Sequence, residues 1–250
     1  MKPAPGAEPV RWYKNGYGSK YGVYRMADCV PLREKQPRTE KQRQSGARLG
    51  LQARMKSERG RAARLAHSWL SLDPVFLDTE TTGLDAGAQA LEIGLVNVSG
   101  DLIYETRLKP TVSIDPEAAA VHGISEAMLA DAPAWPDIAQ QLQHHIGRRP
   151  MVIFNADFDT RILKQTAAAY NDTASWLDTL TVYCAMWLAA GYYGSTNRYG
   201  TISLASTASQ AGLSWTGQAH SAIADAVMTA RVVNDIAEYW CQLQREMDDN

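Results

Sequence analysis

The sequence of 250 residues has few cysteines and no long hydrophobic run. Its three cysteines, Cys29, Cys184 and Cys241, are widely spaced and odd in number, so they predict neither a disulfide framework nor a zinc knuckle. No stretch of about 18 apolar residues is present, which argues against a membrane-spanning helix. The first residues also lack the apolar segment of a secretory signal. These absences predict a protein of the reducing cytoplasm.

The net charge is small, but the charged residues are unevenly distributed. The formal net charge is −2, yet residues 1–67 contain 16 Lys and Arg against 5 Asp and Glu. Residues 68–250 contain the remaining 9 Lys and Arg against 22 Asp and Glu. A basic segment joined to an acidic one is typical of chains that bind nucleic acid or a membrane surface.

The composition divides the chain into a basic N-terminal extension over residues 1–70 and a compact domain over residues 71–250. Residues 11–25 interleave one Trp and four Tyr with Lys, Arg and Gly, a pattern that disfavours helix. From about Pro37 the extension predicts a helix that is marginal without a packing surface. One interpretation is a flexible, solvated extension. Another is an arm whose cations neutralise phosphates while its aromatic rings stack on bases. A third is a docking segment for a partner protein.

The compact domain reads as α/β. The apolar runs 74–78 and 150–154 predict buried strands, and 90–98 and 101–109 flank Ser99-Gly100 as an antiparallel hairpin. We expect helices over 136–146, 156–169, 178–190, 201–211 and 221–243, with helical fragments in 115–130. This order predicts a mixed sheet covered by helices.

Two carboxylates end the first apolar strand. Asp78 and Glu80 are two residues apart, so in an extended chain their side chains point to the same side. Two anions at the end of a buried strand cost free energy unless a cation lies between them. The turn that follows contains Gly83, which allows a ligand to approach the backbone closely. The alternative interpretation is an ordinary polar strand end.

Further candidates lie at later helix starts. Asp157 and Asp159 both fall in the first turns of a predicted helix, where acids also complement the helix dipole, and spacing alone does not choose between them. If Ser221 caps the last helix, His220 lies in the preceding loop and Asp225, one turn in, faces the same space. In isolation, a histidine at such a junction is more often structural.

Taken together, VFLDTETTGLD, FNADFDTRIL and HSAIADA resemble, in this order and spacing, the three exonuclease motifs of the DEDD superfamily. The H-x4-D pattern of the third motif is that of the histidine-containing, DnaQ-like branch. The resemblance covers about residues 73–237 and implies a ribonuclease H-like mixed sheet flanked by helices. Two details depart from the common pattern: Phe154 stands where many members have His, and 192–200 forms a longer loop.

The resemblance implies four metal ligands, Asp78, Glu80, Asp159 and Asp225, and so selects Asp159 over Asp157. Ligands that offer only oxygen suit Mg²⁺ or Mn²⁺, and four carboxylates suit two such ions. His220 is implied as the general base. The implied activity is metal-dependent 3′→5′ exonucleolytic hydrolysis that releases nucleoside 5′-monophosphates.

The resemblance also implies where the substrate binds. Family members hold the terminal nucleotide just after the first motif, which implies Thr81, Thr82, Gly83 and Leu84, with His122 and Phe158 as further candidates. The expected partner is nucleic acid with a free 3′ end, and single-stranded DNA is slightly favoured over RNA because of the length and charge of the extension. Within the enzyme class, an exoribonuclease is the alternative. The competing interpretation is a ribonuclease H-like module that holds nucleic acid or a polymerase without cutting.

Overall fold

The computed structural model describes residues 1–32, 37–215 and 220–249 and divides into two compact units, Met1–Gly46 and Ala47–Asn250. The division falls inside helix α1 (Glu40–Lys56), whereas the sequence predicts a boundary after residue 70. The difference arises because helix α2 (Glu58–Leu70) buries its apolar face in the second unit. Residues 33–36 of the predicted extension lie outside the described residues.

The first unit contains two short antiparallel pairs. Strand β1 (Lys2–Pro3) pairs with β4 (Cys29–Val30), and β2 (Arg11–Lys14) pairs with β3 (Lys20–Val23). A single 3-10 turn, Met26–Asp28, precedes β4. None of the described residues of this unit is buried, so it has no core comparable to that of the second unit.

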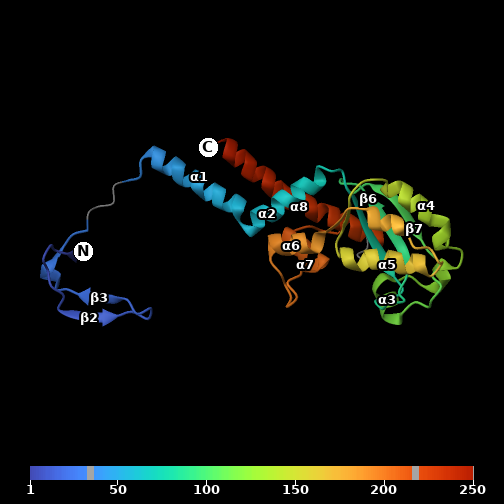
Figure 1. The fold of residues 1–250 in the computed structure, drawn as a ribbon, viewed down its shortest axis with the longest axis horizontal. Helices are drawn as coiled ribbons and strands as arrows, with labels where there is room; N and C mark the ends of the chain where they lie inside the picture. Colours follow the sequence, from blue (N-terminus) through green and yellow to red (C-terminus); the bar gives the residue numbers. More distant parts are fainter. Residues whose placement is uncertain (33–36, 216–219, 250) are drawn as a thin grey trace. The chain divides into compact units, whose positions relative to one another are not determined.

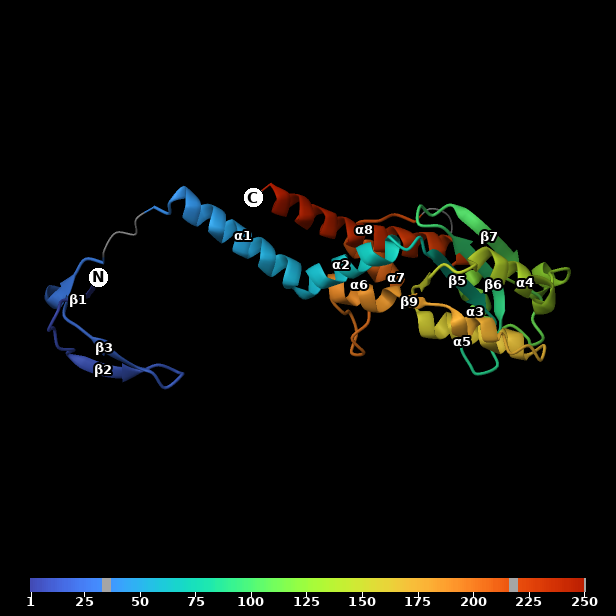
Figure 2. The same cartoon turned by 45° about the horizontal axis from the view of Figure 1, so that its top comes forward.

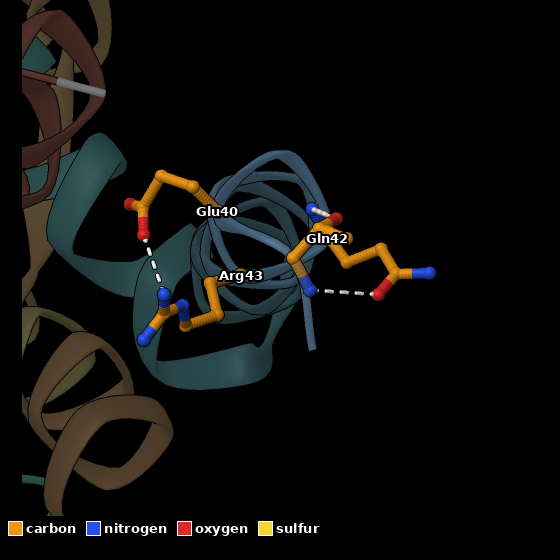
Figure 3. Close-up of polar contacts among 4 residues, drawn as sticks. Glu40, Gln42 and Arg43 are labelled. Atoms are coloured by element: carbon orange, nitrogen blue, oxygen red, sulfur yellow. Dashed lines mark hydrogen bonds and ion pairs between the residues drawn. The ribbon is translucent and has the colours of Figure 1, made fainter. Parts of the chain in front are cut away.

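Helix α1 begins with a capping box. The amide of Gln42 donates to Thr39 Oγ1 at 3.2 Å, and the amide of Thr39 donates to Gln42 Oε1 at 3.0 Å. An ion pair of 3.0 Å joins Arg43 to Glu40 on the same turn (Figure 3). Two amides without an intrahelical acceptor are thereby satisfied. The start of α1 is therefore fixed by contacts within residues 39–43.

The second unit is built on a five-stranded sheet in the order β7-β6-β5-β8-β9. Strands β5 and β6, and β6 and β7, pair antiparallel, whereas β5 and β8, and β8 and β9, pair parallel. Its strands are β5 (Val75–Thr81), β6 (Ala90–Val96), β7 (Leu102–Arg107), β8 (Met151–Ile153) and β9 (Val182–Cys184). Its remaining helices are α3 (Pro116–His122), α4 (Trp135–Ile146), α5 (Ala156–Ala168), α6 (Ala185–Tyr193), α7 (Leu204–Ala211) and α8 (Ala222–Asp248), with 3-10 turns at Glu126–Leu129 and Ser175–Thr179.

Helices cover both faces of this sheet (Figure 1). Side chains of successive strand residues point to opposite faces. Phe76 accordingly packs with α2, α6, α7 and α8, while Val75 and Leu77 pack with α4 and α5. Both faces of β5 are buried, which explains why its sequence reads as a continuous apolar run up to Asp78.

Helix α2 lies along α8 and against α6 (Figures 1 and 2). Its small residues face inward: Ala62, Ala63 and Ala66 are at most 8% exposed. A Cβ on Gly60 would lie 2.2 Å from the carbonyl oxygen of Arg54, so only glycine allows the sharp turn between α1 and α2. At the far end of α2, Trp69 stacks on Tyr183 with ring centroids 4.6 Å apart.

The fold class predicted from the sequence is confirmed. One expected element is wrong: residues 178–190 form the end of a 3-10 turn, strand β9 and the start of α6 rather than a single helix. A three-residue strand is too short to leave a periodic pattern. Within the described residues, no helix combines the length and apolarity needed to cross a membrane.

Candidate active site

The site begins at the carboxyl end of β5, the central strand of the sheet. Asp78 pairs with Gly94 and Glu80 with Glu92 on β6, and the register shifts just after Glu80. Because Asp78 and Glu80 are two residues apart on this strand, both point to the face that α8 covers. The strand thus brings two carboxylates together beneath one helix.

Asp159 comes from the first turn of α5 and is held in place by the residue between those two acids. Its Oδ1 accepts hydrogen bonds from the Thr79 hydroxyl at 2.8 Å and from the Thr79 amide at 3.1 Å. Asp159 is only 4% exposed, whereas Asp157 lies on the exposed side of α5. The structure therefore separates the two acids that spacing alone leaves equivalent.

His220 and Asp225 are brought together by the start of α8. Ser221 caps the helix by accepting from the amide of Ala224 at 3.3 Å, so His220 lies in the loop, as expected. The amide of His220 donates to Asp225 Oδ1 at 3.2 Å. With φ of 63°, His220 adopts the left-handed conformation that few side chains favour. That conformation turns the chain into the helix next to Asp225.

Gly94 allows α8 to reach this position. A Cβ at Gly94 would lie 2.6 Å from both the carbonyl carbon of Ala222 and the amide nitrogen of Ile223. These are backbone atoms of the first turn of α8, so they cannot rotate out of the way. The absence of a side chain opposite Asp78 thus sets the distance between α8 and β5.

Five candidate side chains line one cavity of about 190 Å³, which we call the acidic cavity. They are Asp78, Glu80, Asp159, His220 and Asp225. One carboxylate oxygen each from Asp78, Glu80 and Asp225 lie within 4.8 Å of one another. Asp159 borders the same cavity outside this closest group. Oxygen donors at such spacing are the ligand set that Mg²⁺ or Mn²⁺ prefers.

The pKa values of these acids reflect their burial first and the charges of their neighbours second. Burial, reinforced by the charges of Asp159, Asp225 and Glu80, raises the pKa of Asp78 well above its ordinary value. Burial and the charge of Asp225 raise the pKa of Glu80 to about 8. Burial raises the pKa of Asp159 to about 7 despite its bonds to Thr79, and it raises the pKa of Asp225 as well. Four neighbouring acids cannot all ionise easily without a positive charge among them. A bound cation would supply that charge and stabilise their ionised forms.

A second cavity of about 470 Å³ adjoins the first and is here called the neighbouring cavity. Both cavities share Thr79, Glu80 and Phe158. Most of the predicted substrate-binding residues line the neighbouring cavity, namely Thr81, Gly83, Leu84, His122 and Phe158. Leu84 is 78% exposed, so an apolar side chain stands free at its edge.

Two predicted substrate contacts are engaged internally. The Thr82 amide donates to the Gln89 carbonyl at 2.8 Å, its hydroxyl accepts from the Gln89 amide at 2.9 Å, and it lines neither cavity. His122 Nδ1 accepts from the amide of Ile124 at 2.9 Å, so Nε2 carries the proton and donates to the Thr81 carbonyl at 3.2 Å. Burial lowers the pKa of His122, consistent with this neutral form. Both residues brace the turn after β5.

Three residues to which the sequence assigns no role also border the acidic cavity: Thr79, Phe154 and Leu204. Asn155 borders the cavity as well. Thr79 had a detectable signal, because a hydroxyl between two strand-end acids is placed to donate to a third. The contribution of Leu204 from α7 depends on tertiary packing and leaves no local pattern.

Known proteins resemble this chain over the residues that form the site. The family model of the RNase T type of exonuclease matches residues 75–233. An uncharacterized exonuclease, CP81, of Escherichia phage 186 is 39% identical over 179 residues, which cover 69% of this chain and 92% of that protein. An uncharacterized protein, pSLT049, of Salmonella typhimurium is 76% identical over 126 residues, which cover 50% of this chain and 91% of that protein.

Solved structures show similar folds. Exonuclease X, in complex with 5′-overhanging duplex DNA, aligns with a TM-score of 0.52 and 27% identity over 70% of this chain and 97% of its own. The nuclease domain of 3′hExo, a DEDDh family member bound to rAMP, aligns with a TM-score of 0.55 and 12% identity, over 67% of this chain and 92% of its own. At that identity the second match speaks for the fold alone.

Proposed function

The chain belongs to the DEDD superfamily of exonucleases, in its DnaQ-like branch, and on this premise we propose that it is a metal-dependent 3′→5′ exonuclease that releases nucleoside 5′-monophosphates. The observation that carries the proposal is the acidic cavity, where four carboxylates and one histidine from three separate segments line a single space. A non-cleaving nucleic-acid module has no need to concentrate so much buried negative charge.

The donor set fits divalent cations. Asp78, Glu80 and Asp225 would hold the first ion, and Asp159 together with Asp78 would complete a second position. When bound, such ions supply Lewis-acid stabilisation to the phosphate under attack and to the leaving 3′ oxygen. Mg²⁺ or Mn²⁺ is proposed because every ligand is a carboxylate oxygen.

The remaining side chains orient and exchange protons. His220 borders the acidic cavity from a loop, where its imidazole can take a proton from the attacking water. Thr79 fixes Asp159 through two hydrogen bonds, so that acid stays oriented without the ions. The neighbouring cavity is the proposed place of the terminal nucleotide, with Leu84 and Phe158 as apolar surfaces for its base.

DNA is the proposed substrate, slightly favoured over RNA. In support, Exonuclease X, a 27% identical neighbour that this chain covers almost completely, is described in complex with DNA. A role beside a polymerase is a second candidate, because the DNA polymerase III subunit epsilon of Escherichia coli is 37% identical over 95 residues, although these cover only 39% of that subunit. A cytoplasmic setting stays a prediction.

The proposal is tested with 5′-labelled oligonucleotides of single-stranded DNA, duplex DNA and RNA. We expect a ladder of products shortened from the 3′ end with Mg²⁺ or Mn²⁺, nucleoside 5′-monophosphate as the released product, and no reaction in EDTA. Asp78→Asn should abolish the ladder. Binding of every substrate without any shortening would favour the non-cleaving alternative, and a faster ladder on RNA would reverse the substrate preference.

The role of His220 is tested separately. His220→Ala should lower kcat by about 10²–10⁴-fold, because proton transfer is lost. The rise in melting temperature on adding Mn²⁺ should remain, since the carboxylates are intact. His67→Ala, at an exposed histidine of α2, serves as the control. A His220→Ala enzyme with normal kcat would contradict the assignment.

A further inference from the structure

The β2–β3 hairpin of the first unit exposes an unusual amount of aromatic surface. Trp12 is 60% exposed, Tyr13 41%, Tyr21 51%, and Tyr17 at the turn 97%. No core cluster of the described residues includes a side chain from this unit. Large aromatic side chains that no core covers are typical of binding surfaces.

The pairing of β2 with β3 determines which face of the hairpin each ring occupies. Residues directly opposite each other in an antiparallel pair lie on one face, so Tyr13 and Tyr21 share a face, and their rings stack with centroids 5.8 Å apart. The guanidinium of Arg11 lies over the Tyr13 ring, 5.3 Å from its centroid. Trp12 lies on the opposite face, across from Gly22, and stays mostly exposed although Pro9 and Tyr24 lie close to that glycine.

The charge of the hairpin selects an anionic ligand. Residues 9–27 contain four Lys and Arg and no Asp or Glu. Lys14 and Lys20 are directly opposite each other at the end of the ladder next to the turn. Like charges at such a cross-strand pair destabilise a sheet, so an anion bound between them would relieve a cost that is built into the hairpin.

The turn that carries this surface is ordered by its own hydrogen bonds. The Asn15 side chain accepts from the amides of Tyr17 at 3.1 Å and Ser19 at 2.9 Å, and Gly18 adopts φ of 81°. The lysine pair and the stacked tyrosines are therefore presented on a defined scaffold rather than on a loose chain.

We propose that this hairpin, residues 9–25, is a second nucleic-acid-binding surface, separate from the acidic cavity, which takes single-stranded nucleic acid. Bases stack on Tyr13 and Tyr21 on one face, where Arg11 pairs with phosphate, and on Trp12 on the other face, where Lys14 and Lys20 pair with phosphates. Stacking requires unpaired bases, so duplexes bind less well. The choice of nucleic acid over other polyanions rests on the proposed function. The assignment of the hairpin as a binding surface rests on its exposed rings and its cations.

Binding is measured by fluorescence anisotropy with the full chain in EDTA, so that cleavage plays no part. The probes are oligothymidylate and oligouridylate of about 15 nucleotides and a duplex of the same length. The double variant Trp12→Ala/Tyr13→Ala should weaken single-strand binding by about 10- to 100-fold. Trp187→Ala is the matched control, because Trp187 is 53% exposed on α6 of the other unit, and its affinity should equal that of the wild type.

Two further variants separate stacking from folding and charge. Tyr13→Phe/Tyr21→Phe keeps the rings and should retain affinity, which excludes a mere loss of the hydroxyls. Lys14→Ala/Lys20→Ala should reduce the slope of log affinity against log salt concentration by about 1.4. Arg64→Ala/Arg148→Ala removes two exposed cations of the second unit and should change that slope less.

A crosslinking readout does not depend on variants. Oligothymidylate that contains a photoreactive 5-iodouracil should crosslink to a peptide within residues 9–25 of the wild-type chain. Absence of that crosslink, unchanged affinity of Trp12→Ala/Tyr13→Ala, or equally tight duplex binding would each overturn the proposal. Hairpin-dependent binding in a protein that never cleaves would refute the proposed function and leave this inference standing.

Discussion

At Gly94, helix α8 packs directly on the sheet because no side chain lies between them. The first turn of α8 lies directly on this residue, which pairs with Asp78 in the sheet. Asp225 is one turn further along α8, so its distance from Asp78 depends on this contact. Because residue 94 has no methyl group, α8 lies close enough to β5 to place the Asp225 carboxylate near Asp78.

Gly94→Ala tests this contact. Its methyl group would meet backbone that cannot rotate away, so we expect a loss of about 1–3 kcal/mol in unfolding free energy and a displaced α8 start. Exonuclease activity should fall more than the loss of stability explains. Gly191→Ala in α6 is the control, because its Cβ would make only an ordinary contact of 3.7 Å with Ala62. Thermal melting and steady-state rates measure both variants, and equal behaviour of the two would contradict the argument.

The pKa of Glu80 gives a pH dependence with a definite sign. Because folding raises this pKa from about 4.5 to about 8, the folded state holds the proton more tightly than the unfolded chain. Stability is therefore full below the unfolded value and is lost as the pH rises through about 8, by roughly 2–4 kcal/mol.

Melting curves of the metal-free protein between pH 6 and pH 9 measure this loss. Glu80→Gln cannot ionise and should melt at a higher temperature than the wild type at pH 9. Added Mn²⁺ should restore the wild type at pH 9 but have a smaller effect on Glu80→Gln. A metal-free wild type that becomes more stable with rising pH would contradict the sign.

At this scale, the sequence predicts the carboxylates of the site, since strand ends and helix caps are local features. Asp78 and Glu80 follow from alternation along β5, and the placement of His220 before the helix follows from Ser221 as its cap. Neither the internal bonding of His122 nor the approach at Gly94 is local. Both depend on which distant backbone segment packs against the residue, and a single sequence does not specify that packing.

Among the elements, α2 differs most from expectation. The sequence predicts helix in this region but assigns it to a basic extension, because its charged residues outnumber its larger apolar ones. Packing here depends on alanines, which are too small to produce a strong apolar stripe. Arg59 also lies between Tyr192 and Tyr239, 4.4 and 4.8 Å from their ring centroids, so even a cation of this helix contacts the core.

Two truncations distinguish extension from integral helix. Removal of residues 1–46 should leave the melting temperature of the second unit nearly unchanged, because no core cluster residue is lost. Removal of residues 1–67 deletes Ala62, Ala63 and Ala66 from the core and should cause partial unfolding or aggregation. Circular dichroism melting of both proteins checks this. Identical melting would mean that α2 is dispensable.

For the molecule as a whole, charge and chemistry are divided between the two units. Residues 1–46 contain 10 Lys and Arg against 4 Asp and Glu, whereas residues 47–250 contain 15 against 23. All candidate catalytic residues belong to the acidic unit, which on its own repels a polyanion. A tethered cationic unit raises the local concentration of a long strand near the acidic one.

This division predicts that loss of the first unit affects KM more than kcat. Removal of residues 1–46 should raise KM for long single strands and flatten its dependence on salt, since fewer phosphates are neutralised. The effect on kcat should be small, because the acidic cavity is retained. Rates at several salt concentrations measure both quantities. A KM that does not change at low salt would contradict the division.

The position of β5 has a consequence for the lifetime of the site. This strand has a neighbour on each side and a packed layer on each face. We therefore expect its amides to exchange with solvent deuterium through global opening. The two strands of the aromatic hairpin have no such cover, and their amides should exchange orders of magnitude sooner. The carboxylates on β5 would then keep their positions through local openings that expose the hairpin amides to solvent.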